Sequence, residues 1–344
     1  MRPFQGRLRL VNLKVYTPKC VRVRLNKKTF SIGVDLGGTN IKYGIISSSG
    51  EILKKGMIPS RAGSRKEVIL ANIRKAITCL LAFAQNKNIK IERIGLGCPG
   101  TVNVKTGTIM NMVPNVPQLE NVNMKRELQR YFDNPIFVDN DANLMAWAEY
   151  LLGAARGYNN CLCLTVGTGI GSGIILNGKL FRGSSFAGAE FGHTSICYAG
   201  IKCNCGNIGC VEMYASAKAM VRKARRLLTE KKKSILRKMI NGNLKKISTK
   251  SIFDAWKKGD RLCSQIVDET CLYLGTAIAS AVNLLNPEVV VIGGGVADAG
   301  IGFIRKIEKE IKKRANPSAI KNLKVVKAQW GNDAGFIGAG LLKE

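Results

Sequence analysis

The stretch Phe30–Ser47, with the sequence FSIGVDLGGTNIKYGIIS, decides the fold of this chain. FSIGVD predicts a strand, GGTN a glycine turn and IKYGIIS a second strand. The segment EILKKGMI (51–58) predicts a third strand directly afterwards. The region therefore begins as a β-hairpin that is extended by one strand.

The same pattern recurs in the second half of the chain. CLCLTV (161–166) predicts a strand, GTGIGS (167–172) a glycine turn and GIIL (173–176) another strand. Aligning Gly44–Ile46 with Gly173–Ile175 superimposes the two strand–turn–strand units after a one-residue gap. The repeat predicts an α/β fold built twice, with two α/β domains around a cleft.

Apolar periodicity predicts further elements between and after these hairpins. Helices are expected at 66–85, 124–131, 142–155 and 261–285, and strands at 91–97, 136–139, 288–296 and 323–328. We expect an N-terminal α/β domain over residues 29–140 and a C-terminal α/β domain over residues 141–344. The last helix, rich in Gly and Ala, is a candidate to pack back on the first domain.

The composition is that of a globular protein, with 344 residues, 46% hydrophobic and 22% charged. No apolar run reaches the length that spans a bilayer, and the basic N-terminus lacks the apolar stretch and cleavage site of a signal peptide. Eleven cysteines in a chain of this size do not indicate a small disulfide scaffold. We therefore expect a protein of the reducing cytoplasm.

The net charge of +31 is extreme for a soluble enzyme. Residues 1–28 hold nine basic residues and no acid, and residues 222–258 hold fourteen basic residues against two acids. A nucleic-acid or anionic-membrane surface is one interpretation. A solvated, Lys-rich surface is the other, and we favour it because few aromatic residues accompany the charges. Residues 1–28 are expected to form a basic, flexible extension, and nucleic acid is not an expected partner.

Glycine turns follow the first strand of each hairpin. In Asp35–Asn40 and Gly167–Gly169, backbone N–H groups can approach phosphate oxygens, and two facing turns would clamp the phosphates of a nucleotide. Asp35 would hold Mg²⁺ through water. Gly293–Gly295 ends a predicted strand, where it would let adenine or ribose lie close to the backbone or allow tight helix–strand packing. The candidate nucleotide-binding residues are Asp35, Gly37, Gly38, Thr39, Gly167, Thr168, Gly169, Gly293, Gly294 and Gly295.

The sequence Asp139-Asn140-Asp141 lies between a predicted strand end and a predicted helix start. On the simplest interpretation, Asn140 or Asp141 caps that helix. A carboxylate at such a strand end is also placed to accept the proton of a substrate hydroxyl that attacks a phosphoryl group. Because two candidate phosphate turns occur in the same chain, Asp141 is the predicted catalytic base.

His193 is the only histidine, and it forms the pattern His-x9-Cys-x-Cys-x4-Cys with Cys203, Cys205 and Cys210. One imidazole and three thiolates make a complete tetrahedral ligand set for Zn²⁺. The zinc would be structural, because protein atoms take all four positions. A buried histidine near reduced cysteines is the alternative, and the short spacing favours the metal.

Several motifs together resemble the ROK family of sugar kinases over residues 30–342, in the family's order: DLGGTNIKYGII, Pro99-Gly100, VDNDANLMAWAE, VGTGIGSGIIL, GAEFGH, CxCGxxGCxE and GNDAGFIGA. The resemblance implies the duplicated actin-like (ribonuclease-H-like) fold, ATP with Mg²⁺, and phosphorylation of a hexose, glucose above all, at its C6 hydroxyl. It implies Asp141 as the base and His193 as both zinc ligand and sugar contact. The implied sugar-binding residues are Gly100, Asn115, Asn140, Asp141, Glu190, His193 and Glu212. Thr101 and Asn103 depart from the PGPVD form of the family's sugar-side loop.

Alternative functions remain at this point. N-acetylmannosamine, N-acetylglucosamine and fructose kinases share these motifs. A sugar-responsive repressor of the same family would carry a helix-turn-helix domain, and the 29 residues before Phe30 show no pair of amphipathic helices. A zinc-ribbon nucleic-acid module would leave Asp141 and the glycine turns without a role. A homodimer or higher homo-oligomer is expected.

Overall fold

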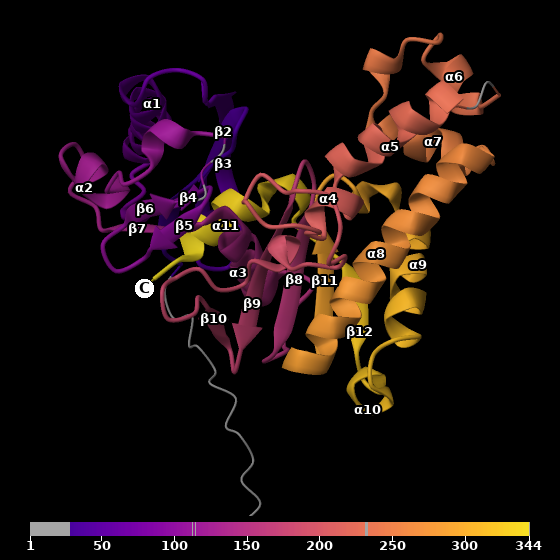
Figure 1. Cartoon of the computed structure of the whole chain (residues 1–344). Coiled ribbons are helices and arrows are strands. Elements are labelled where there is room, and N and C mark those ends of the chain that lie inside the picture. Colours follow the sequence, from indigo (N-terminus) through magenta and orange to yellow (C-terminus); the bar gives the residue numbers. More distant parts are fainter. Residues whose placement is uncertain (1–27, 112, 114, 231–232, 344) are drawn as a thin grey trace, which may run out of the picture.

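Two five-stranded sheets with the same strand order form the centre of the molecule (Figure 1). The structure, a computed structural model, describes residues 28–111, 113, 115–230 and 233–343. The basic extension expected over residues 1–28 lies outside the described residues, except for Lys28, which forms an ion pair with Glu51. The sequence prediction of an α/β fold built twice is confirmed.

The first sheet has the order β3-β2-β1-β4-β7. Its first three strands form an antiparallel meander, whereas β4 and β7 run parallel to β1. Its strands are β1 (Phe30–Leu36), β2 (Asn40–Ser47), β3 (Ile52–Pro59), β4 (Ile91–Cys98) and β7 (Ile136–Asn140). A separate small hairpin, β5 (Thr101–Asn103) with β6 (Thr108–Asn111), follows β4.

The second sheet repeats this plan as β10-β9-β8-β11-β12. Its strands are β8 (Cys161–Val166), β9 (Ile170–Leu176), β10 (Lys179–Phe181), β11 (Val289–Gly293) and β12 (Lys324–Lys327). The expected turn over 167–172 is too long, because Ile170 already pairs with Val166 and begins β9. Asn177 and Gly178 form the hairpin turn expected from their sequence, and it connects β9 to β10, a strand of only three residues.

Helices cover the sheets and connect their parallel strands. In the first half, α1 contacts β1, β2 and β3. In the second half, the long α8 contacts α9, α5 and α7, and α9 also contacts β12. The helices are α1 (Lys66–Asn86), α2 (Met124–Gln129), α3 (Asp141–Leu152), α4 (Glu212–Ala215), α5 (Ala217–Glu230), α6 (Ile235–Met239), α7 (Thr249–Lys257), α8 (Arg261–Leu285), α9 (Ile301–Lys312), α10 (Pro317–Ile320) and α11 (Ala334–Leu341). Single 3-10 turns occur at Pro117–Leu119, Phe191–His193, Leu244–Lys246, Ala297–Ala299 and Gly331–Asp333.

Two helices, α3 and α11, pack against each other between the halves (Figure 1). The helix α3 contacts β8 and β9 of the second sheet, and α11 contacts β1, β2 and β4 of the first. Glycine permits these contacts: a Cβ on Gly33 or Gly95 would collide with the backbone of α11. The aligned glycines behave alike, because a Cβ on Gly44 would meet Phe336 of α11 and one on Gly173 would meet Ala146 of α3.

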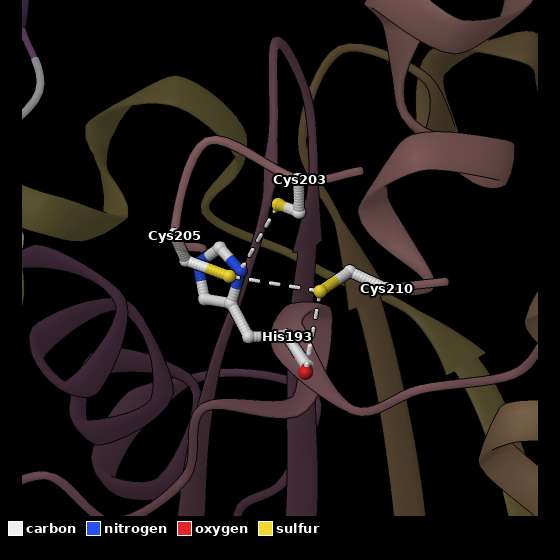
Figure 2. A group of neighbouring side chains, drawn as sticks. All are labelled: His193, Cys203, Cys205 and Cys210. Carbon is white, nitrogen blue, oxygen red and sulfur yellow. Dashed lines mark hydrogen bonds between the residues drawn. The ribbon is translucent and has the colours of Figure 1, made fainter. Parts of the chain in front are cut away.

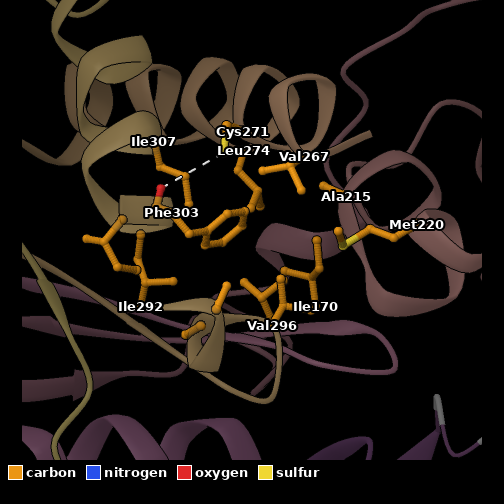
Figure 3. Packing of buried hydrophobic residues seen from close by; sticks show 14 of the residues in the cluster. Ile170, Ala215, Met220, Val267, Cys271, Leu274, Ile292, Val296, Phe303 and Ile307 are labelled. Atoms are coloured by element: carbon orange, nitrogen blue, oxygen red, sulfur yellow. Dashed lines mark hydrogen bonds between the residues drawn. The ribbon is translucent and has the colours of Figure 1, made fainter. Parts of the chain in front are cut away.

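The largest core lies in the second half, between the sheet and its helices (Figure 3). Phe303 of α9 is fully buried there, and its ring packs edge-on against Phe253 of α7 with centroids 5.5 Å apart. Ile292 of β11 and Leu274 of α8 belong to the same cluster. This core ties α5, α7, α8 and α9 to the second sheet. No helix in the described part of the chain is long and apolar enough to cross a membrane.

The contact between α3 and α11 generates a stability prediction. A Cβ added at Gly338 would collide with the backbone carbonyl of Leu144, which cannot rotate away. We therefore expect Gly338→Ala to destabilise the protein by about 1–3 kcal/mol, despite the better helix propensity of Ala. Urea unfolding measures the change. Gly63→Ala, an exposed site with open space around it, is the matched control and should change stability by less than about 0.5 kcal/mol. Equal stabilities of the two variants would contradict the role assigned to Gly338.

Candidate active site and metal centre

Two neighbouring polar residues at the start of α3 have different roles, since Asn140 caps the helix and Asp141 does not. The Asn140 side chain caps the helix: its Oδ1 accepts hydrogen bonds from the N–H groups of Ala142 (2.9 Å) and Asn143 (3.1 Å). Its Nδ2 donates to the Gly100 carbonyl at 3.0 Å, so the same amide also holds the loop after β4. Asp141 is the first residue of the helix, and its Oδ1 accepts a hydrogen bond from the adjacent Ala142 N–H at 2.9 Å. The capping requirement is thus met by Asn140.

Burial raises the pKa of Asp141 to about 7, and the negative charges of Asp35 and Glu190 act in the same direction. The N–H of Ala142 offsets part of this increase by stabilising the carboxylate. A carboxyl group with this pKa is close to half ionised at neutral pH. It can therefore both accept and hold a proton under ordinary conditions.

Asp35, at the end of β1, is the second perturbed carboxyl group. Burial raises its pKa to about 6, and the nearby ammonium of Lys42 limits the increase. Its carboxylate lies against Gly335 near the start of α11, where a Cβ would collide with it. Burial likewise raises the pKa of the Cys98 thiol, at the end of β4, and the charges of Asp141 and Asp35 add to the effect. The C-terminal ends of β1 and β4 and the N-terminal end of α11 therefore lie close to the start of α3.

A cavity of about 440 Å³ lies between the two halves and is lined by Asp35 and Asp141 together. Besides Asp35, the predicted nucleotide-binding residues that line it are Gly167, Thr168, Gly294 and Gly295. The remaining candidates for nucleotide binding, Gly37, Gly38, Thr39, Gly169 and Gly293, are not part of its lining. The lining also includes four polar side chains that were not predicted from the sequence, those of Lys42, Thr165, Thr249 and Asn332.

A backbone hydrogen bond closes each glycine turn, and the first turn is one residue longer than the second. The Gly37 N–H donates to the Asn40 carbonyl at 3.0 Å, and the Gly167 N–H donates to the Gly169 carbonyl at 2.9 Å. The first turn faces Asn115, since a Cβ on Gly38 would lie 3.3 Å from the Asn115 Cβ. Asn115 therefore lies beside the candidate phosphate turn.

The Gly293–Gly295 run is closely packed at Gly294 and open at Gly295. Gly294 has φ +84° and packs so closely on the Val166 backbone that a Cβ would collide with it. Gly295 has open space around it and lines the cavity. The first two glycines thus serve packing, and the third leaves room for a ligand at the backbone.

The four predicted metal ligands converge on one point (Figure 2). One ligand atom each from His193, Cys203, Cys205 and Cys210 lies within 4.8 Å of the others. The Cys203 Sγ lies 3.7 Å from His193 Nδ1, and the Cys205 and Cys210 sulfurs are also 3.7 Å apart. A tetrahedron with Zn–S bonds of 2.3 Å has edges of about 3.8 Å, so the spacing fits this metal.

The polypeptide around the cluster is arranged to hold the ligands. Gly206 and Gly209 have φ of +94° and +77°, which places the sulfurs on a tightly turning loop. Asn207 Nδ2 donates to the His193 carbonyl at 3.0 Å and to the Cys210 sulfur at 3.4 Å. The Nδ1 of His193 faces the sulfurs, so its Nε2 is left for another partner.

The two acids that flank the cluster have different surroundings. The Glu212 Oε2 accepts the N–H of Ile170 at 2.8 Å, and it lies where a Cβ on Gly169 would be. Glu212 thus supports the second glycine turn. Glu190 is exposed; partial desolvation raises the pKa of its carboxyl group, the charge of His193 lowers it and that of Glu212 raises it. Glu190 thus interacts electrostatically with Asp141, His193 and Glu212, which places these four side chains in one region.

Two departures from the expected sugar-side loop have structural roles. Thr101 is buried at the start of β5. The Asn103 Oδ1 accepts the N–H groups of Lys105 (3.1 Å) and Thr106 (3.3 Å) and so caps the β5–β6 turn. Both residues serve the hairpin that follows Gly100.

The repeated sheet order and the cavity between the halves define a two-domain α/β protein of the actin-like class. The chain belongs to the ROK family, whose family model matches residues 31–344. It is 38% identical over 312 residues to the glucokinase of Halalkalibacterium halodurans, which covers 90% of this chain and 94% of that protein. A ROK family glucokinase from Streptomyces griseus, solved in complex with glucose and AMPPNP, superimposes with a TM-score of 0.79 and 32% identity over 90% of this chain and 98% of that one. The xylose repressor of Caldicellulosiruptor bescii is 32% identical over 89% of this chain and 76% of the repressor.

Proposed function

We propose that this protein is an ATP-dependent sugar kinase that phosphorylates glucose at its C6 hydroxyl, with Asp141 as the general base. The observation that carries the proposal is the free carboxylate of Asp141, which has a pKa of about 7 and lines the cavity opposite a glycine turn. The glucokinase relatives support the choice of sugar and donor. The resemblance to family kinases on which the sequence prediction rested is confirmed.

The reaction follows from this placement. The Asp141 carboxylate takes the proton from the sugar hydroxyl as that oxygen attacks the γ-phosphorus of ATP, and ADP leaves. Asp141 lies at the start of α3, and it shares the cavity with Thr168 and Gly295 on the opposite half. The attacking hydroxyl would thus lie between its base and the phosphate turns. Packing of the two halves around the site limits access of water, which would otherwise compete as acceptor.

The backbone N–H groups of Gly37–Thr39 and Gly167–Gly169 are the proposed donors to the phosphates. Mg²⁺, when bound, neutralises charge on the transferring phosphoryl group. Asp35 is the carboxylate on this side of the cavity that would hold the ion through water. Lys42 donates to the Asn332 carbonyl at 2.9 Å and places a further positive charge in the same cavity.

For the sugar we propose the residues that surround Asp141 on the other side. Gly100, Asn140, Glu190 and His193 are connected to one another or to Asp141 by hydrogen bonds or charge. Asn115 approaches from the first glycine turn. Glu212 can offer the sugar only the oxygen that Ile170 does not use.

A regulator that binds sugar without turning it over is the second candidate, because a xylose repressor is among the relatives. Such a protein needs the sugar residues but no base with a raised pKa. An ADP-release assay across glucose, fructose, N-acetylglucosamine and N-acetylmannosamine separates the candidates. Turnover that is fastest with glucose supports the proposal, and turnover of an N-acetylated sugar alone would replace glucose as the substrate.

We further infer that the His/Cys cluster holds a structural Zn²⁺, and that the protein is a homodimer or larger homo-oligomer. The donor set and its spacing support the metal. For self-association, exposed apolar side chains gather on the metal loop, where Tyr198 is 96% exposed and Ile201 and Ile208 are also open. Light scattering measures the assembled mass directly.

The base assignment predicts both a variant and a pH profile. Asp141→Asn should lower kcat by at least about 10³-fold and leave glucose affinity by calorimetry within about threefold. In the unchanged protein, kcat/KM should fall about tenfold for each pH unit below about 7, because protonation removes the base. Asp133→Asn, at an exposed position, is the control and should change neither quantity. A near-normal kcat of Asp141→Asn would refute the assignment.

The zinc assignment predicts that the purified protein carries about one zinc ion per chain by elemental analysis. Cys205→Ser should lose most of this zinc, unfold at a lower temperature and bind glucose more weakly, because His193 and its loop lose their anchor. Cys79→Ser, an exposed free cysteine of α1, should leave zinc content and stability unchanged. An active, stable Cys205→Ser protein without zinc would show that the cluster does not need the metal.

A further inference from the structure

A buried ion pair joins the two sheets beside the proposed base. Asp139 lies at the end of β7, the edge strand of the first sheet, and its side chain is 1% exposed. Arg182 directly follows β10, the edge strand of the second sheet, and its side chain is 20% exposed. The Nε and Nη2 atoms of Arg182 donate to Asp139 Oδ2 at 2.9 and 2.7 Å. The pair thus bridges the two halves.

Asp139 uses its other oxygen to organise the start of α3. Its Oδ1 accepts the N–H of Asn140 at 2.7 Å and the side-chain Nδ2 of Asn143 at 3.1 Å. Asn140 in turn caps the helix, and Asp141 follows at its first position. Both hydrogen bonds of the Asp139 Oδ1 therefore hold the segment that connects β7 to α3, and this segment orients Asp141.

Arg182 has a corresponding role on the opposite side. Its carbonyl accepts the N–H of Gly188 at 2.8 Å and closes a loop at 183–189. Within this loop Phe186 and Ala189 have φ of +64° and +66°, which are strained for residues with a Cβ. The segment leads directly into Glu190, a proposed sugar contact. Arg182 thus anchors the beginning of a strained loop whose end carries Glu190.

Stability alone is a weak explanation of this pair. A buried ion pair often contributes little more than well-packed apolar residues of the same volume, because both charges lose their hydration. Such a pair does fix the relative position of the two segments that carry it. Here these are the end of β7, which precedes the proposed base, and the loop that precedes Glu190. A displacement of about 1 Å at a reacting group can cost about 10²-fold in rate.

We propose that Arg182 is a positioning residue which, through Asp139, fixes Asp141 and the Glu190 loop on opposite sides of one sugar site. This inference rests on the proposed kinase function. The nucleotide cavity includes neither Asp139 nor Arg182 in its lining, so the effect should fall on the sugar and on turnover, and ATP binding should be spared.

The test compares charge-unbalanced with charge-balanced variants. Arg182→Gln should lower kcat about 100-fold and raise the glucose KM several-fold, with the ATP KM unchanged within about twofold. Arg182→Lys, which keeps the charge, should recover part of the loss. The double variant Asp139→Asn with Arg182→Gln should be more active than the product of the two single effects, because an amide pair replaces the ion pair without an unbalanced charge. Arg130→Gln, which breaks the exposed pair with Glu127, is the matched control and should be without effect.

The outcomes distinguish the two proposals. Wild-type turnover is measured in the same assay, so a wild type that turns over no sugar refutes the kinase function itself. An active wild type with normal kcat and glucose KM in Arg182→Gln refutes the positioning role, whatever happens to the unfolding temperature. If Arg182→Gln does not fold, Arg182→Lys decides: equal losses in the glucose and ATP KM values would show a merely structural residue.

Discussion

The close approach of two helix backbones to two sheets is the constraint on which the rest of the structure depends. It is possible only because Gly33 and Gly95 leave room for α11 and Gly173 leaves room for α3. The helix α11 packs on the first sheet, α3 packs mainly on the second sheet and also contacts β4 and β7 of the first, and the two helices pack on each other, so they join the two repeats. The cavity lined by Asp35 and Asp141 is a direct consequence of this packing.

That arrangement places several carboxyl groups close together in different local environments. Three carboxylates, those of Asp35, Asp139 and Asp141, raise the pKa of Cys98 at the same strand ends. Of the three, Asp139 forms an ion pair with the largely buried Arg182 and is committed to hydrogen bonds. Asp35 and Asp141 keep raised pKa values of about 6 and about 7. Different environments thus distinguish neighbouring carboxyl groups: that of Asp139 is committed to structural hydrogen bonds, whereas those of Asp35 and Asp141 have raised pKa values that suit the chemical roles proposed for them.

Local chemistry made the repeat and the metal ligands predictable. The strand–turn–strand pattern of Phe30–Ser47 and its second copy depend on short-range preferences, and so does the Cys203–Cys210 spacing. The sequence left open which of Asn140 and Asp141 caps α3, because either side chain can do so, and the hydrogen bonds of Asn140 decide it. Nothing in the sequence indicated Arg182 or Lys42, because their roles arise from contacts between distant segments. The length of the second turn was also overestimated, since a ladder pair at Ile170 depends on the partner strand.

The metal cluster and the nucleotide side of the cavity are connected more directly than the sequence pattern suggested. Glu212 follows Cys210 by two residues, and its carboxylate accepts the N–H of Ile170 beneath the second glycine turn. The Ala217 N–H then donates to the Gly167 carbonyl at 2.8 Å, so the chain leaving the cluster contacts that turn twice. A metal bound to Cys210 and His193 would therefore constrain the turn at Gly167–Gly169 as well as the His193 loop. On the proposed function, its structural influence would reach the residues assigned to both substrates.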